Sequence, residues 1–106
     1  MPTSEHRTSS SAPLPVITPH GAFDLDSLPP LEAEIDAALT LHPGVILDAG
    51  GITFADSMFL RLIIATHHRA DLRIAAPSTS VERLLHVIGA DTFLRIYPTV
   101  DDARAA

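Results

Sequence analysis

The sequence predicts a small, single-domain α/β fold in which about four helices pack on a mainly parallel β-sheet. Apolar runs of strand length alternate with segments of helical length, and the crossovers are long enough to return the chain for a parallel strand. The 106 residues leave room for one domain with one modest core. We therefore expect a folded domain over residues 14–106. Residues 1–13 are rich in Ser, Thr and Pro and are expected to form a disordered tail.

Two short strands are expected before the first helix. Residues 14–18 (LPVIT) form a strand at the edge of a sheet, because the prolines in and after this run cannot donate to a neighbouring strand. Residues 21–27 (GAFDLDS) alternate Ala22, Asp24 and Asp26 against Phe23 and Leu25, which predicts the end of a second strand that runs into a polar loop.

The first helix begins after Ser27, a residue type that is favoured as an N-cap. Pro29 and Pro30 suit its first turn, where no backbone N–H is needed. Its apolar residues recur on one face: Leu31, Ile35, Ala38 and Leu39.

The middle of the chain contains a buried strand and a mostly buried helix. Residues 45–47 form the strand, which ends in Asp48 and is followed by a turn at residues 50–51. The helix extends from Met58 to Arg69, and three polar residues form its outer stripe: Arg61, His68 and Arg69.

The last third adds strands at residues 71–75 and 93–97, with a helix between them that ends at Gly89. The apolar residues of this helix follow a regular helical spacing: Val81, Leu84, Leu85 and Ile88. Capping boxes start this helix and a short terminal one: Thr79 with Glu82, and Thr99 with Asp102.

The loops that follow parallel strands gather at one edge of the sheet, where ligands and partners usually bind. Three polar loops are expected there: Asp24–Ser27, Asp56–Ser57 and Ser78–Thr79. The topology therefore predicts a functional surface at that edge.

Composition excludes several functions. The formal net charge of −6 disfavours nucleic-acid binding and fits a protein partner. The chain has no Cys, and no apolar run approaches the roughly 18 residues of a membrane span. We expect a cytoplasmic protein without a cofactor.

The sequence gives little support for a metal site or for an enzyme active site. The His residues are scattered, and the adjacent His67 and His68 point in different directions on a helix, so no metal site is expected. A Walker loop and a G-x-S-x-G motif are absent. Composition leaves a Ser-His-Asp hydrolase open, although nothing in the sequence places a His near Ser57. A phosphoacceptor receiver domain would need more βα units than this chain has.

The Asp56–Ser57 pair lies between two apolar runs and allows two interpretations. Ser57 precedes a helical segment and could be its N-cap. Its hydroxyl could instead accept a phosphate at the positive end of the helix dipole, where Asp56 would repel the phosphate and Arg61 would offset part of its charge. The two roles are compatible, and spacing does not decide between them.

Four motifs, in order, give the chain a resemblance to the STAS domain, the fold of bacterial anti-sigma factor antagonists. The first is a strand end of the form Gly-x-x-Asp at Gly21–Asp24, and the second is a strand that ends in Asp, at Val45–Asp48. The third is the segment before the second helix, Ile52–Ser57, which ends in Asp-Ser. The fourth is an apolar residue followed by Gly near the end of the chain, at Ile88–Gly89. The resemblance covers roughly residues 14–103.

The resemblance implies a phosphorylation-switched binding module and not an enzyme. In that family an anti-sigma factor that is also a serine kinase phosphorylates the Ser after the Asp. The unmodified antagonist binds this kinase and frees the sigma factor, and the phosphorylated form releases the kinase. Ser57 matches the acceptor, and we expect the partner to contact a surrounding set: Asp24, Asp26, Asp56, Met58, Phe59, Arg61, Ser78 and Thr79.

Two departures from the family leave an alternative open. Met58 and Phe59 stand where the family usually has Ser/Thr-Gly, and Phe59 could be either a partner contact or a core residue. The first strand is also short and interrupted by proline. The alternative is a STAS scaffold or ligand-sensing module that is not phosphorylated.

Overall fold

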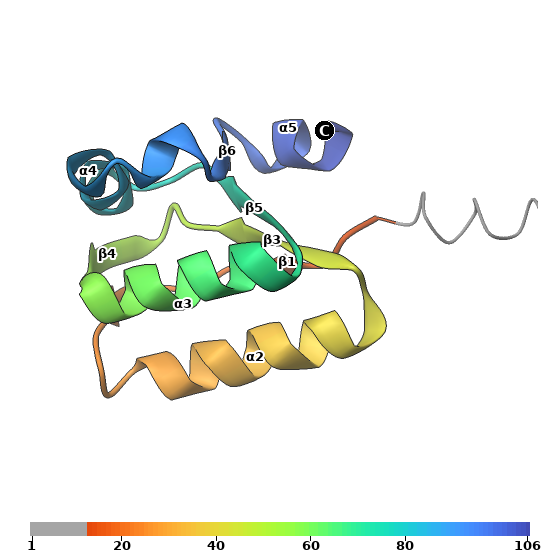
Figure 1. Cartoon of the computed structure of the whole chain (residues 1–106), viewed down its shortest axis with the longest axis horizontal. Coiled ribbons are helices and arrows are strands. Elements are labelled where there is room, and N and C mark those ends of the chain that lie inside the picture. The colour runs from red at the N-terminus through yellow and green to blue at the C-terminus, as the bar shows by residue number, and fades with distance from the viewer. Residues whose placement is uncertain (1–12) are drawn as a thin grey trace, which may run out of the picture.

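The central sheet consists of four parallel strands in the order β1-β3-β5-β6 (Figure 1). The computed structural model describes residues 13–106, so nearly all of the predicted tail lies outside the described residues. The strands of this sheet are β1 (Val16–Ile17), β3 (Gly44–Asp48), β5 (Asp71–Ala75) and β6 (Arg95–Tyr97). β1 lies at the edge, as its prolines predicted.

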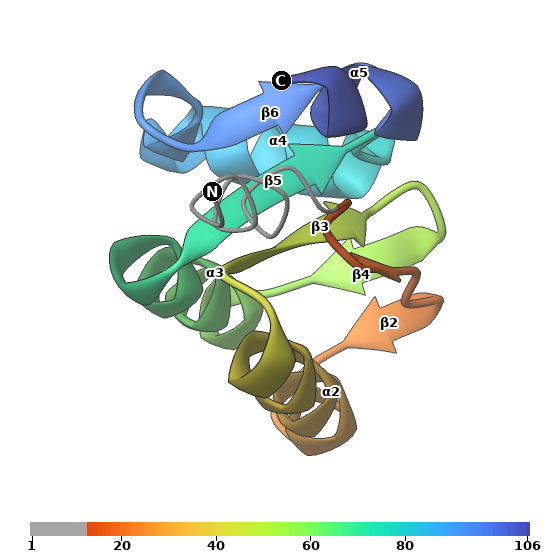
Figure 2. The ribbon, with the colours of Figure 1, turned by 90° about the vertical axis from the view of Figure 1, so that its right-hand side faces the viewer.

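A second sheet pairs β2 (Gly21–Phe23) with β4 (Ile52–Ala55), again in parallel (Figure 2). The sequence pattern did not indicate β4. Its burial pattern explains this, because Ile52 alone is fully buried and Thr53 and Phe54 are both exposed, so the segment lacks strand alternation. The other expected strands are present, and the predicted fold class is confirmed.

The described residues contain four α-helices. They are α2 (Leu28–Leu41), α3 (Ser57–Arg69), α4 (Thr79–Ile88) and α5 (Val100–Ala105), and a 3₁₀ turn, η1 (Ala90–Thr92), follows α4. α2 and α3 lie on one side of the central sheet, and α5 lies on the other (Figure 1). α4 packs on β4.

Alternation along β3 divides the core between these two faces. Val45 and Leu47 belong to the larger cluster, which contains Ile35, Ile63 and the buried residues of α4. Ile46 points to the opposite face, where it packs with Ala75 of β5 and with Ala103 of α5. Because β3 is buried on both faces, it supplies the continuous apolar run that the sequence shows.

The caps of α2 and α4 differ from the predicted ones. Ser27 holds the N-cap position of α2, but its side chain makes no capping bond. In α4 the cap is Ser78 and not Thr79, since Ser78 Oγ accepts from Val81 N at 3.3 Å. The cap of α5 is confirmed, with Thr99 Oγ1 accepting from Asp102 N at 3.0 Å.

α4 ends at Gly89, which adopts the left-handed conformation (φ 84°) that favours glycine. Ile88, expected on its buried face, is 54% exposed.

Candidate functional site

The loops after β2 and β4 lie beside each other. Phe23, the last residue of β2, pairs with Ala55, the last residue of β4. Asp24 and Asp56 therefore follow neighbouring strand ends, and α2 and α3 both start at the end of the molecule drawn at the left in Figure 1. The structure thus brings two of the three predicted loops together.

Asp56, and not Ser57, is the N-cap of α3. Its backbone is extended, and Asp56 Oδ1 accepts from Met58 N at 2.9 Å and from Phe59 N at 3.3 Å. Ser57 is the first residue of the helix and is exposed. None of the hydrogen bonds among residues 13–106 uses its hydroxyl. The capping interpretation of Ser57 is therefore wrong, and its hydroxyl faces solvent.

The assignment of this cap predicts different stabilities for two adjacent alanine substitutions. We expect Asp56→Ala to lower the free energy of unfolding by about 1 kcal/mol, because two N–H groups lose their acceptor. Ser57→Ala should change it by less than about 0.5 kcal/mol, as is usual for a surface residue. Urea denaturation of both variants measures the difference, and a larger loss for Ser57→Ala would contradict this assignment.

The Asp24 loop is held by hydrogen bonds within itself. Ser27 Oγ lies 3.1 Å from Asp24 Oδ1, and the backbone N–H groups of Ser27 and Asp26 donate to the same oxygen at 3.2 and 3.1 Å. The hydroxyl of Ser27, followed by these backbone N–H groups, lowers the pKa of the Asp24 carboxyl below its usual value of 3.8. Asp24 is exposed, so it presents a fixed negative charge next to the start of α3.

A groove between the first turns of α2 and α3 adjoins Ser57. The residues that line it include Leu25, Glu32, Met58, Arg61 and Leu62. Leu25 is 66% exposed, and Arg61 forms no ion pair with any residue from 13 to 106. We define the Ser57 surface as residues 24–26, Ser57, Met58 and Arg61, together with this groove.

Three residues of this groove were not expected from the sequence: Leu25, Glu32 and Leu62. Leu25 alternates with Phe23 in the sequence and so looked like a buried strand residue, but β2 ends before it. An apolar residue between two Asp residues, just after a short strand, was the feature of the sequence that could have indicated an exposed Leu25.

Phe59 does not belong to the Ser57 surface. It is 1% exposed and lies in the core, where its ring centroid is 6.3 Å from that of Phe23. The structure therefore corrects its assignment as a partner contact. Met58, the other departure from the family motif, is partly buried and lines the groove.

The third predicted loop, Ser78–Thr79, lies away from Ser57. Ser78 N donates to Ala49 O in the turn before β4, and Ser80 Oγ donates to Thr53 O near the start of that strand. Ser57 follows the end of β4 and comes four positions after Thr53, a separation of about 13 Å at the usual strand rise. The expectation that Ser78 and Thr79 lie in one loop cluster with Ser57 is therefore wrong.

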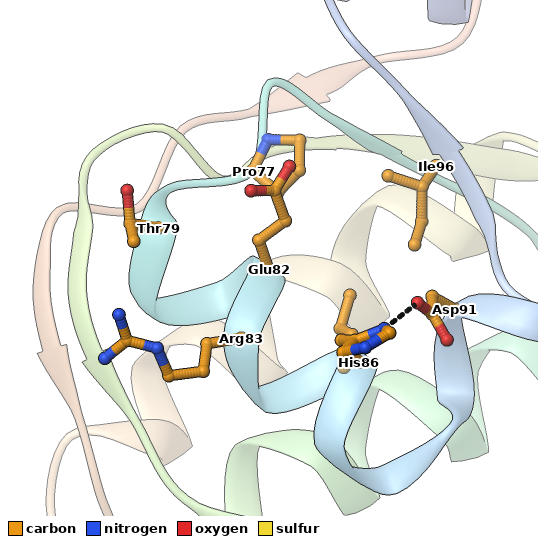
Figure 3. A pocket seen from close by; sticks show the side chains of 8 residues that line it. Pro77, Thr79, Glu82, Arg83, His86, Asp91 and Ile96 are labelled. Carbon is orange, nitrogen blue, oxygen red and sulfur yellow. Dashed lines mark hydrogen bonds and ion pairs between the residues drawn. The ribbon is translucent and has the colours of Figure 1, made fainter.

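Thr79 instead borders a second pocket, between α4 and β6 (Figure 3). Pro77, Leu85 and Ile96 provide its apolar part. Charges of both signs surround it, and His86 Nδ1 lies 3.0 Å from Asp91 Oδ2. This pocket contains none of the residues of the Ser57 surface.

Neither a metal centre nor a membrane segment is found in the described part of the chain. Residues 13–106 hold no group of three or more His, Asp or Glu side chains placed to bind a metal ion. None of their helices is long and apolar enough to cross a bilayer.

A comparison with protein families supports the resemblance seen in the sequence. A family model described as "Mlab, STAS domain" matches residues 6–96. None of the curated proteins compared with the chain matches it.

The solved structures that are similar to this fold include two anti-sigma factor antagonists. An anti-sigma factor antagonist from Mycobacterium paratuberculosis is 28% identical with a TM-score of 0.74, over 83% of this chain and 80% of that chain. The unphosphorylated form of the anti-sigma factor antagonist SpoIIAA is 18% identical with a TM-score of 0.70, over 87% of this chain and 86% of that chain. The second likeness concerns the fold alone.

Proposed function

Because the chain belongs to the STAS domain family, we propose that it is an anti-sigma factor antagonist whose binding is switched by phosphorylation of Ser57. In this proposal the unmodified protein binds an anti-sigma factor that is also a serine kinase, and a sigma factor is thereby freed. The protein itself is a binding module and not an enzyme. The kinase supplies ATP, magnesium and the catalytic base, while this chain supplies a positioned hydroxyl.

The free hydroxyl of Ser57 is the observation that carries the proposal. It lies on the first residue of a helix that is fixed to the core by Phe59, so its position is rigid. Since Asp56 already caps the helix, Ser57 can be modified without loss of a capping bond. A kinase can therefore reach a well-placed acceptor whose modification leaves the fold intact.

The same cap favours an outward-facing phosphate. Asp56 already occupies the N–H groups of Met58 and Phe59, which would otherwise bind a phosphate at the helix start. Its carboxylate also repels the added charge, which is about −1.5 to −2. Arg61, one turn later on the same helix, is the cation nearest in sequence and would offset part of it. The phosphate would thus add negative charge to a surface that already holds Asp24 and Asp26.

Such a charge would weaken an interface that includes the apolar groove beside Ser57. Leu25 and Met58 give the partner apolar contacts there. A phosphate at its rim would have to be desolvated, and Arg61, the cation nearest in sequence, would compensate only part of its charge. The structural consequence is release of the partner without unfolding of the domain.

Intact-mass spectrometry tests the acceptor directly. We expect incubation with ATP, magnesium and the anti-sigma kinases encoded in the same genome to add about 80 Da, the mass of one phosphoryl group on a hydroxyl. Ser57→Ala should abolish the shift, and Ser80→Ala is the matched control that should retain it. A shift that persists in Ser57→Ala would move the acceptor to another residue. A kinase that binds but never modifies the chain would leave Ser57 on an unmodified scaffold.

The second candidate function is a ligand-sensing STAS module, which the pocket between α4 and β6 favours. Its residues Glu82, Arg83, His86 and Asp91 offer both signs of charge to a small polar molecule (Figure 3). This candidate predicts that Ser57 variants bind their partner like the natural chain, so the same substitutions separate the two functions.

A further inference from the structure

Arg61 is a cation that the packing of the domain does not use. Its side chain is exposed and forms no ion pair within residues 13–106. The positions one turn before and after it on α3 hold no acid with which it could pair along the helix: Ser57, Met58, Ile64 and Ala65. Its charge is therefore available to a group that comes from outside the domain.

Arg61 lies on the same stripe of α3 as Ser57. Residues four apart on a helix are neighbours, with their Cβ atoms about 5–6 Å apart. Both residues are exposed, whereas Phe59 and Ile63 are buried on the opposite side of the helix. The Cα–Cβ bonds of a helix tilt toward its N-terminus, so the side chain of Arg61 leaves the helix in the direction of Ser57. The guanidinium group can therefore reach a phosphoryl group at the Ser57 hydroxyl.

Three acids near the acceptor oppose the approach of a phosphate donor. Asp24 and Asp26 lie in the loop after β2, which ends beside β4, and Asp56 directly precedes the acceptor. The γ-phosphate of ATP is itself an anion, so it meets like charges on its way to Ser57. During transfer, negative charge spreads over the three equatorial oxygens of the phosphoryl group, and a cation placed there stabilises the transition state. On this chain the cation nearest in sequence to the acceptor is Arg61.

We propose that Arg61 binds the γ-phosphoryl group during its transfer, and so acts as a catalytic residue that the substrate itself supplies. This inference rests on the proposed phosphorylation of Ser57. In that step Ser57 Oγ attacks the γ-phosphorus of ATP, the bond from this phosphorus to the β–γ bridging oxygen breaks, and ADP leaves. The hydroxyl proton passes to the catalytic base of the kinase. Arg61 donates hydrogen bonds to the phosphoryl oxygens while their charge develops.

Single-turnover phosphorylation of the full chain at saturating kinase measures the chemical step. We expect Arg61→Gln to lower the rate constant at least about tenfold, because a donor aimed at developing charge is usually worth about 10²–10³ in rate and this one is exposed to solvent. Arg61→Lys should keep part of the rate, since it retains the charge but loses the planar fork. Arg83→Gln is the matched control, because it removes the same charge from an exposed residue of α4 that borders other pockets, and it should leave the rate unchanged.

Binding of a transition-state analogue gives a readout that does not depend on turnover. Kinase loaded with ADP and aluminium fluoride holds a mimic of the transferring phosphoryl group, and it should bind the natural chain at least about tenfold more tightly than kinase loaded with ADP alone. Arg61→Gln should lose most of this gain, while Arg83→Gln should keep it. A residue that only contacts the kinase would weaken both complexes alike. Calorimetry measures the four affinities, and circular dichroism confirms that both variants fold.

The outcomes separate the role of Arg61 from the function on which it rests. A natural chain that no kinase of its genome modifies overturns the proposed phosphorylation of Ser57, and the role of Arg61 with it. If Arg61→Gln is modified on Ser57 at the natural rate, the role of Arg61 is overturned and the switch stands. A rate that is low only below saturating kinase assigns Arg61 to binding of the kinase, which also overturns the catalytic role.

Discussion

Phe59→Ala should lower the free energy of unfolding by about 3–5 kcal/mol, the usual cost of removing a buried phenylalanine side chain. Phe59 is 1% exposed and packs against Phe23, with the two rings tilted by 43°. The substitution leaves a cavity beneath the two loops of the Ser57 surface. Since a domain of this size is stable by only about 5–15 kcal/mol, the urea midpoint should fall by a large fraction of its value.

Phe54→Ala is the matched control for this prediction. It removes the same side chain from a residue that is 53% exposed, and so it should cost less than about 1 kcal/mol. The affinity of Phe59→Ala for the partner, measured beside its stability, distinguishes a core residue from a contact residue. A Phe59→Ala variant that keeps its stability but loses its partner would show that Phe59 is a contact residue, as its place in the motif allowed.

β3 was predictable because burial on both faces leaves a continuous apolar run, and β5 was predictable because Leu72 and Ile74 alternate with polar residues. Residues 45–47 and 71–75 are flanked by turn signals, and both form strands in the structure. β4 escaped prediction for the opposite physical reason. Only Ile52 of its four residues is fully buried, and its backbone pairing with β2 leaves no periodic pattern in the sequence.

The missing strand also explains the error in the site. Without β4, the Asp56–Ser57 loop was expected next to Ser78–Thr79, at the shared end of parallel strands. The turn at residues 49–51 does lie beside Ser78. β4 then carries the chain away from that turn, to an end beside β2. The Asp24 loop and Ser57 therefore share a surface, and Ser78 does not.

Adjacent capping residues pose a different problem. Asp56–Ser57 and Ser78–Thr79 each contain two good N-caps, and the sequence does not fix which residue adopts the extended backbone that a cap needs. The structure selects the first residue of each pair. At Asp56 this follows from β4, which ends one residue earlier, and the choice leaves Ser57 free.

Ser57→Asp should weaken binding to the anti-sigma partner by about 3 kcal/mol, or roughly a hundredfold in dissociation constant. The added carboxylate lies at the rim of the groove formed by Leu25 and Met58, next to Asp56 and near Asp24. An interface that covers this groove would have to desolvate the new charge beside Asp56 and Asp24, and Arg61, the cation nearest in sequence, would offset only part of it. The loss should appear mainly as faster dissociation.

Ser57→Ala separates charge from shape in the same experiment. The hydroxyl makes no hydrogen bond within residues 13–106, so its removal should leave affinity within about threefold of the natural chain and keep the protein permanently in the binding state. Calorimetry with the purified partner, at two salt concentrations, measures both variants. An electrostatic switch requires that added salt reduce the difference between Asp and Ala, because screening weakens repulsion among exposed acids. Equal affinities for the two variants would identify a scaffold whose partner does not contact Ser57, and an equal loss in both would identify the hydroxyl itself as a contact.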